Sequence, residues 1–408
     1  MGEAVSPQRF FSRALTLFVA ISLLQLFHLL FLARLEWENI VVWLVVFLTG
    51  LTALGLIRIK VPSTERWPEF RLRTFLFLFF SSFLVTFVFS RIPYLVAFFD
   101  LGMYDLRQES DLGGGGWYSY FAILFYPLAI LLAFINISRK WYFVCLFFVA
   151  VVVAVDLLVL GTRGAPVFVA IFHLLMARVR YGRLRMWLAL LGLVAIFLLV
   201  FDYQTKARSL NTVTVGWDWS LTLAHSWLFD RLPLKSWVID SVSGGLWFLG
   251  PVVYFLQYIS HSIAEFRFLL FGGTYDLFGS FLYVRDEVCL VLGCGREVIH
   301  QAIESANPRA GLYQTLYSSL LIDFGFLGFF GLILAYLVWL VGVSSRVYGM
   351  GFLIYFSVVV TVSAVENYFY GGLGLARFIV FGFLWIMLVS PVGIRSRSYL
   401  VFSREWAS

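Results

Sequence analysis

Charged residues are scarce in this chain, and several motifs of soluble enzymes are missing from it. Only 13% of the 408 residues are charged, whereas 61% are hydrophobic. Soluble domains have about 25% charged and about 45–50% apolar residues. A soluble fold could not hide so much apolar surface, so the expected solvent is lipid. Apolar runs of about 20 residues recur along the chain, and each can cross the hydrocarbon layer as a helix.

The missing motifs exclude several classes of function. No P-loop pattern is present, which argues against nucleotide hydrolysis. No His/Cys cluster has metal-ligand spacing, so neither a metal nor another cofactor is predicted. The net charge of +7 indicates contacts with anionic lipid. No nucleic-acid partner is expected, because no basic patch interleaved with aromatics lies outside the apolar runs. Of three cysteines, Cys145 lies in an apolar run, while Cys289 and Cys294 either bridge in an extracytoplasmic loop or stay buried thiols.

The apolar runs predict an all-α polytopic membrane protein, with residues 1–408 as one integral membrane domain. Ten spanning helices are expected, at residues 11–32, 39–57, 73–90, 117–137, 141–160, 164–178, 186–201, 325–343, 349–367 and 374–392. Loops on one side are rich in Lys and Arg, and the alternating loops are acidic. By the positive-inside rule, both termini are expected in the cytoplasm.

The connection between the seventh and eighth expected helices, residues 202–312, is unusually long and lies on the outer side. It is rich in Trp, Phe, Tyr and Leu, so order is expected rather than disorder. Its apolar stretches at 246–259, 266–271 and 277–284 are short, or broken by Gly250-Pro251. We interpret them as re-entrant or interfacial helices that cap a cavity. A pair of true spans, which would give twelve in all, is the alternative.

Some polar residues fall inside the expected spans or at their outer ends. Asp156 lies within the fifth span and is expected to pair with a basic residue of a neighbouring helix, because buried carboxylates are costly in lipid. Glu366 and Arg377 flank the last outer turn, and they either pair with each other or line the mouth of a cavity. His28 and His173 lie within spans and are expected to be packed there.

The outer loops are unusually basic, although such loops normally avoid Lys and Arg. Arg163, in the turn Gly161-Thr-Arg-Gly164, either reaches for lipid headgroups or contacts a phosphate beside backbone N–H groups. The other outer cations bind an anionic substrate or form salt bridges; they are Arg91, Arg107, Lys206, Arg208, Arg231, Lys235, Arg267, Arg285, Arg296 and Arg309. His300 lies in the densest polar stretch and is a candidate general base.

Three short stretches resemble Wzy-type O-antigen polymerases, which join oligosaccharide repeat units. The first runs from Arg309 to Gly328 and contains Asp323-Phe-Gly-Phe-Leu-Gly, similar to the family's Asp-Phe-Gly-x-x-Gly. The others are the turn around Arg163 and Tyr104-Asp-Leu-Arg107. Tyr313-Gln314 stands where the related O-antigen ligases show a His-Asn-like pair, which disfavours a ligase.

The resemblance implies a GT-C-like fold in the bacterial inner membrane and a glycosyltransferase of lipopolysaccharide biosynthesis. The growing glycan would move from undecaprenyl pyrophosphate to a sugar hydroxyl of the next lipid-linked repeat unit, on the periplasmic face and without a metal. Arginines would hold the pyrophosphate; the candidates are Arg163, Arg107, Arg208, Arg285 and Arg309. The catalytic candidates are His300, Asp323 and Tyr313.

The partners that the resemblance implies are the lipid-linked oligosaccharide, membrane lipid, a polysaccharide chain-length regulator and a flippase. An O-antigen ligase and a lipid-linked oligosaccharide flippase are the alternative functions. A flippase should show short loops, intramembrane cations and repeat symmetry, and the long outer segment argues against it. A peptidoglycan polymerase has a similar helix plan, but its signature motifs are not found here.

Overall fold

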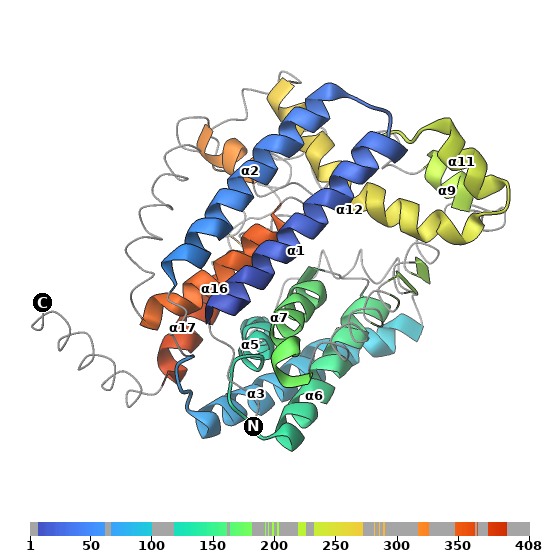
Figure 1. Ribbon diagram of the computed structural model, residues 1–408. Helices are drawn as coiled ribbons and strands as arrows, with labels where there is room; N and C mark the ends of the chain where they lie inside the picture. Colours follow the sequence, from blue (N-terminus) through green and yellow to red (C-terminus); the bar gives the residue numbers. More distant parts are fainter. Residues whose placement is uncertain are drawn as a thin grey trace, which may run out of the picture.

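The chain is built almost entirely from helices (Figure 1). The computed structural model describes residues 7–61, 67–99, 118–160, 164–181, 192, 195, 198–199, 202–203, 219–225, 232–271, 281, 285, 289, 317–325, 347–363, 365 and 374–389. Within these ranges the only β-structure is two isolated bridges, Ala33 with Leu234 and Phe70 with Val389. The predicted all-α class is therefore confirmed for the described part of the chain.

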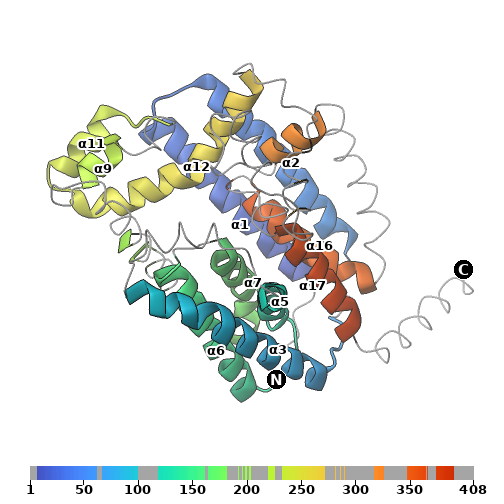
Figure 2. The same cartoon turned by 180° about the vertical axis from the view of Figure 1, so that it is seen from behind.

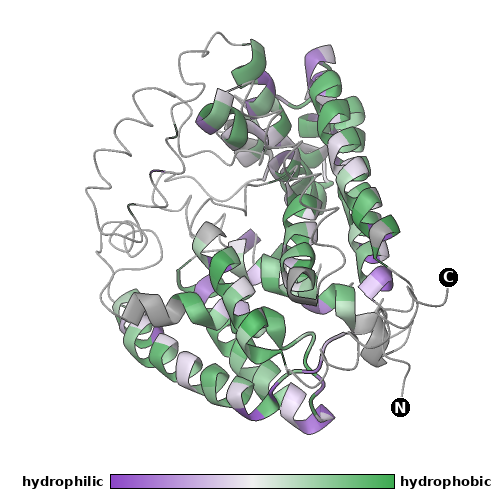
Figure 3. Cartoon of the chain, turned by 90° about the vertical axis from the view of Figure 1, so that its left-hand side faces the viewer, coloured by the Kyte–Doolittle hydropathy of each residue, from purple (hydrophilic) through white to green (hydrophobic). Residues whose placement is uncertain are grey.

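Within the described ranges, four helices are long and apolar enough to cross a membrane, as expected of a membrane-embedded protein. They cover Pro7–Leu32, Trp37–Ile59, Leu72–Phe99 and Arg139–Leu158, and they match the first, second, third and fifth expected spans. Apolar colouring covers most of the helical surface, and hydrophilic patches lie mainly at helix ends (Figure 3). Shorter apolar helices match the sixth, ninth and tenth expected spans, at Gly164–Met176, Met350–Val362 and Ala376–Leu388.

Two expected spans, at 186–201 and 325–343, lie almost wholly outside the described residues, so the total of ten remains a prediction.

Close contacts between glycines and aromatic rings hold neighbouring helices together. In α1 (Pro7–Phe27), the ring of Phe18 lies against Gly50 of α2 (Trp37–Lys60). Two more such contacts join the late helices α16 (Val347–Val362) and α17 (Gly374–Leu388). There, the Trp385 ring covers Gly351, and Phe352 covers Gly382. Small residues allow this close approach, and packing of this kind replaces the hydrophobic driving force that is missing between helices in lipid.

Helix α5 (Tyr118–Leu131) lies at the centre of one helical group. It contacts α3 (Leu72–Thr86), α17 and α7 (Gly164–Tyr181), while α6 (Arg139–Leu158) packs beside α7. All side chains from 125 to 135 are buried, as expected for a helix that is apolar on every face. Figures 1 and 2 show α3, α5, α6 and α7 grouped together from opposite directions.

The segment that was expected on the outer side forms a helical group of α9 (Trp219–His225), α11 (Ser236–Ser243), a 3-10 turn (Trp247–Leu249) and α12 (Gly250–Phe271), and α12 also packs against α1 and α2. In both views α9 and α11 lie together at one end of α12 (Figure 2). The segment is joined to the turn after α1, where Arg34 N–H donates to Pro233 O at 2.8 Å and Lys235 N–H donates to Leu32 O at 2.8 Å.

Part of the expectation for this segment was wrong. Residues 250–259 of the first expected stretch and all of the second, 266–271, belong to one continuous 22-residue helix, α12. Residues 246–249 precede this helix. Pro251 stands in its first turn, where the missing N–H costs no helical hydrogen bond. Trp219 and Tyr254 pack against each other with ring centroids 5.8 Å apart and are 5% and 8% exposed. They are core residues, which leaves neither ring open to a sugar or to lipid headgroups.

The glycine contacts predict a selective loss of stability. A Cβ atom at Gly351 would lie 2.4 Å from the Trp385 ring, whereas one at Gly55 would meet nothing within 4 Å. We expect Gly351→Ala to destabilise the protein by about 1–3 kcal/mol through overpacking. Gly55→Ala should be neutral, or stabilising by about 0.5–1 kcal/mol. Denaturation in mild detergent measures both, and equal effects of the two variants would contradict this packing.

Candidate functional site

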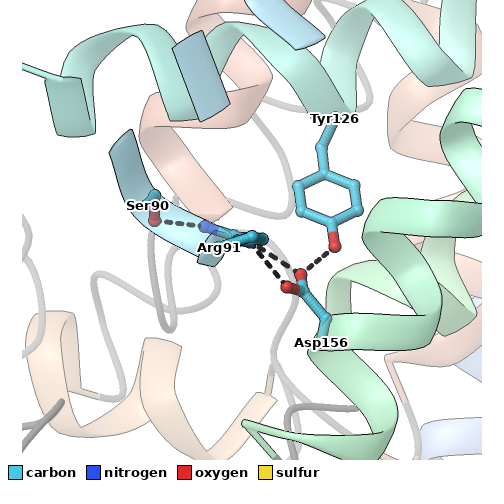
Figure 4. A network of polar contacts seen from close by, with 4 residues as sticks. All are labelled: Ser90, Arg91, Tyr126 and Asp156. Carbon is cyan, nitrogen blue, oxygen red and sulfur yellow. Dashed lines mark hydrogen bonds and ion pairs between the residues drawn. The ribbon is translucent and has the colours of Figure 1, made fainter. Parts of the chain in front are cut away.

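Arg91 and Asp156 form a buried ion pair between two helices (Figure 4). Arg91 Nε lies 2.7 Å from Asp156 Oδ1, and Nη2 lies 3.0 Å from Oδ2. This two-pronged geometry is the strongest that an arginine and a carboxylate adopt. The side chains are only 13% and 4% exposed. The expectation that Asp156 pairs with a basic residue of a neighbouring helix is confirmed.

The position of Arg91 corrects the expected end of the third helix. We expected a span at 73–90 followed by a loop, but α3 continues through a π-helical turn, Phe87–Arg91, and stays helical to Phe99. Arg91 therefore lies within a helix, at a local π-turn of the kind that often marks functional sites. Its partner Asp156 lies in the last turn of α6, where the negative helix end repels a carboxylate, so a cation there is needed.

Tyr126 links this ion pair to a second arginine. Its hydroxyl, on α5, donates a short hydrogen bond to Asp156 Oδ2, and Figure 4 shows Arg91 and Tyr126 converging on one carboxylate. The guanidinium carbon of Arg377 lies 5.5 Å from the centroid of the Tyr126 ring, within the range of a cation–π contact. One tyrosine therefore lies between two cations.

Arg377 lines a small cavity where two helices begin. The cavity holds about 10 Å³, space for about one water molecule. Ala165 is the second residue of α7, and Gly374 is the first residue of α17. The lining includes Tyr126, Ala165, Phe168, Tyr355, Gly374 and Arg377. Arg377 thus lines a cavity, in agreement with one of its two expected roles, while its pairing with Glu366 stays a prediction because Glu366 lies outside the described residues.

Most of the predicted site residues also lie outside the described residues. They are Arg163, Arg107, Arg208, Arg309, His300 and Tyr313. Arg163 directly precedes α7 in the sequence, and the first turn of α7 reaches the cavity through Ala165. In the sequence, the turn predicted to contact phosphate thus ends one residue before Ala165, which lines the cavity.

Asp323 and Arg285, the remaining predicted residues, belong to one neighbourhood. The backbone N–H of Phe281 donates to Asp323 O at 3.2 Å, and Arg285 N–H donates to Phe281 O at 2.9 Å. Arg285 is exposed and Asp323 is buried. Phe281 has φ +56°, a strained conformation for a bulky residue, and such strain often occurs at functional sites.

Asp323 lies in the described helical residues 317–325, just before the expected eighth span at 325–343. Most of that span lies outside the described residues, so a role of Asp323 at its start stays a prediction.

Lys235, Arg267 and His173 have structural partners, and His28 is packed in the core. Lys235 Nζ donates to Leu30 O at 2.8 Å, and Arg267 pairs with Glu36. The ring nitrogens of His173 lie 2.9 Å from the Tyr142 hydroxyl and 2.9 Å from Ala129 O. His28 is fully buried. The expected packing role of both span histidines is confirmed.

Sequence reasoning did not select Tyr126 or Tyr355, and it left Arg377 out of the proposed anion-binding set. Tyrosines are numerous in this chain, so no local pattern distinguishes these two. Arg377 did carry a signal, because it lies in the first turn of a helix directly after a glycine-rich turn, where cations are disfavoured.

Comparison with known protein families, with curated proteins and with solved structures finds no match to this chain. The site must therefore be interpreted from its own geometry.

The buried ion pair predicts a strong dependence of stability on both partners. Arg91→Met or Asp156→Leu alone should destabilise the protein by about 3–5 kcal/mol, because each leaves an uncompensated charge. The double variant should recover most of this loss. Arg267→Met is the control, since the pair with Glu36 is more exposed and is worth about 0–1 kcal/mol. Denaturation in detergent tests this, and additive losses in the double variant would contradict it.

A second prediction concerns the cysteines. Cys289 is disulfide-bonded, and Cys145 is free and buried. We expect alkylation of the unfolded, unreduced protein to label one thiol, and labelling after reduction to reach all three cysteines of the sequence. Mass spectrometry of the intact chain measures the difference. Three labels without reduction would contradict the bridge.

Proposed function

We propose that this protein polymerises O-antigen repeat units carried on undecaprenyl pyrophosphate, at the periplasmic face of the bacterial inner membrane. The observation that carries the proposal is Arg377, a cation lining a cavity between the starts of α7 and α17. The same cavity is lined by Ala165, which in the sequence directly follows the turn Gly161-Thr-Arg-Gly164 that resembles the polymerase family's turn. A membrane enzyme that handles a lipid diphosphate needs cations of this kind at the ends of its spans.

The positions of the polar groups agree with chemistry at one membrane face. Asp156 is near the end of α6 and is paired with Arg91, and α7 and α17 begin at the cavity. In the ten-helix topology these three helix ends are outer ends. The disulfide at Cys289 supports the same side, because disulfides persist in the periplasm and are rare in the cytosol.

The proposed reaction has two chemical requirements. The acceptor hydroxyl attacks the anomeric carbon of the donor sugar, and the bond from that carbon to the diphosphate oxygen breaks with its electron pair leaving on the diphosphate. Arginines stabilise this leaving group. A base takes the hydroxyl proton; Asp323, His300 and Tyr313 are the candidates. The proximity of Arg285 to Asp323 through Phe281 favours Asp323 as the first to test.

Gene deletion in the host, followed by gel analysis of the lipopolysaccharide, tests the proposal. We expect the O-antigen ladder to collapse to core plus one repeat unit. The wild-type gene should restore the ladder, while Arg163→Ala or Asp323→Asn should reduce it at least tenfold. Arg139→Ala, an exposed arginine at the start of α6, is the control and should restore it.

The other outcomes of the deletion point elsewhere. Loss of even the single repeat unit would indicate a ligase or a flippase. An unchanged ladder would contradict a role in this glycan.

A further inference from the structure

We propose that Arg377 is a binding residue for a phosphate oxygen, in a site formed by the cavity between α5, α7, α16 and α17. The identity of the ligand as a lipid diphosphate rests on the proposed function. Binding of an oxyanion rests on the geometry alone. Arg377 does not belong to the set of arginines that the sequence motifs indicated.

The charge balance of the cluster calls for an anion. Arg91 and Arg377 carry two positive charges and Asp156 carries one negative charge, so one positive charge is in excess among the described residues. Asp156 is committed to Arg91 by two hydrogen bonds and to Tyr126 by a third. Within the described part of the chain, no carboxylate pairs with Arg377, and its buried Nε meets no hydrogen-bond acceptor. Arg377 is only partly buried as a whole, but a cation that is partly removed from water and has no counter-charge is still costly, and a bound oxyanion would reduce that cost.

Two helix starts add to the positive potential of the cavity. The first-turn N–H groups of a helix have no partner within it, and its N-terminus carries about half a positive charge. Neither α7 nor α17 has an acidic residue in its first turn to offset this. In α17 the first turn instead carries Arg377 itself. Gly374 and Ala165 leave both starts with small side chains at the cavity wall.

The size of the cavity limits what enters it. A space of about 10 Å³ accepts a group the size of a water molecule, such as a single phosphate oxygen. The remaining atoms of the phosphate would then lie at the mouth of the cavity. Phe168 and Tyr355 are part of the wall, and their low polarity strengthens the charge–charge attraction at this point.

Tyr126 acts as a positioning residue in this site. Its ring faces the Arg377 guanidinium, and its hydroxyl is held by Asp156, which Arg91 fixes in turn. The Arg91–Asp156 pair thus fixes the ring against which Arg377 packs. Neither residue of the pair touches the ligand. Tyr126→Phe should weaken binding less than loss of Arg377, because the ring that faces the guanidinium remains.

Binding of inorganic pyrophosphate to the purified full-length chain in detergent tests the site. The unfolding midpoint is followed against pyrophosphate concentration, with chloride at equal ionic strength as reference. We expect saturable stabilisation of the wild type, binding at least tenfold weaker in Arg377→Gln, and partial retention in Arg377→Lys. Arg139→Gln is the matched control, since Arg139 also lies over an aromatic ring, at 5.8 Å from Phe143, and should bind as wild type.

Equal binding by wild type and Arg377→Gln would overturn the site. If Arg377→Gln fails to fold without ligand, the comparison of wild type with Arg377→Lys and Tyr126→Phe decides instead, and unchanged binding in both overturns the site.

A second arm identifies the source of the oxyanion and separates this inference from the proposed function. Farnesyl diphosphate, with farnesol as its uncharged control, is compared with inorganic pyrophosphate. Tighter Arg377-dependent binding of farnesyl diphosphate supports a lipid ligand, and equal binding of both supports a site for free phosphate compounds. Binding of farnesyl diphosphate that does not depend on Arg377 would contradict the site. An unchanged O-antigen ladder in the deletion strain would reject the proposed polymerase but leave the binding results intact.

Discussion

The ion pair between Arg91 and Asp156 is the interaction on which the described site depends. Both charges lie in an apolar helical group, where either one alone would cost several kcal/mol. The pair ties α6 to the helix that continues α3, and the Tyr126 hydroxyl ties α5 to the same carboxylate. This three-helix junction fixes the Tyr126 ring, and the ring in turn lies against Arg377 at the start of α17. A structural ion pair thus determines where a second cation meets the cavity.

The outer segment is built on a different principle. Its backbone is hydrogen-bonded to the turn after α1, and its α9, α11 and α12 share their own apolar core around Trp219 and Leu223. The polar residues of α12 are turned inward, where Gln25 on α1 donates to Ile259 O at 2.6 Å and Gln257 donates to Leu232 O at 2.8 Å. Two basic residues of this region, Lys235 and Arg267, are used for such attachment, so a count of the cations expected on the outer side overstates the number available to a substrate.

Some of this arrangement was predictable from sequence. The cost of a carboxylate in lipid is a property of Asp156 alone, so its pairing could be expected. Its partner could not, because Arg91 reaches it only if the helix continues past residue 90 through a π-turn. Gly250-Pro251 suggested a break, yet a proline is equally suited to a helix start, and only tertiary packing decides between the two. Arg377 could pair with Glu366 or line a cavity, and the sequence contains nothing that separates these roles.

The central claim is that the excess positive charge beside this ion pair receives a phosphate group. The most direct test is an electron cryomicroscopy structure of the full chain in lipid nanodiscs with a prenyl diphosphate. We expect phosphate density within hydrogen-bond distance, about 2.7–3.2 Å, of the Arg377 guanidinium, with Tyr126 still bonded to Asp156. Phosphate density bound elsewhere, with Arg377 paired to a carboxylate of the protein, would contradict it.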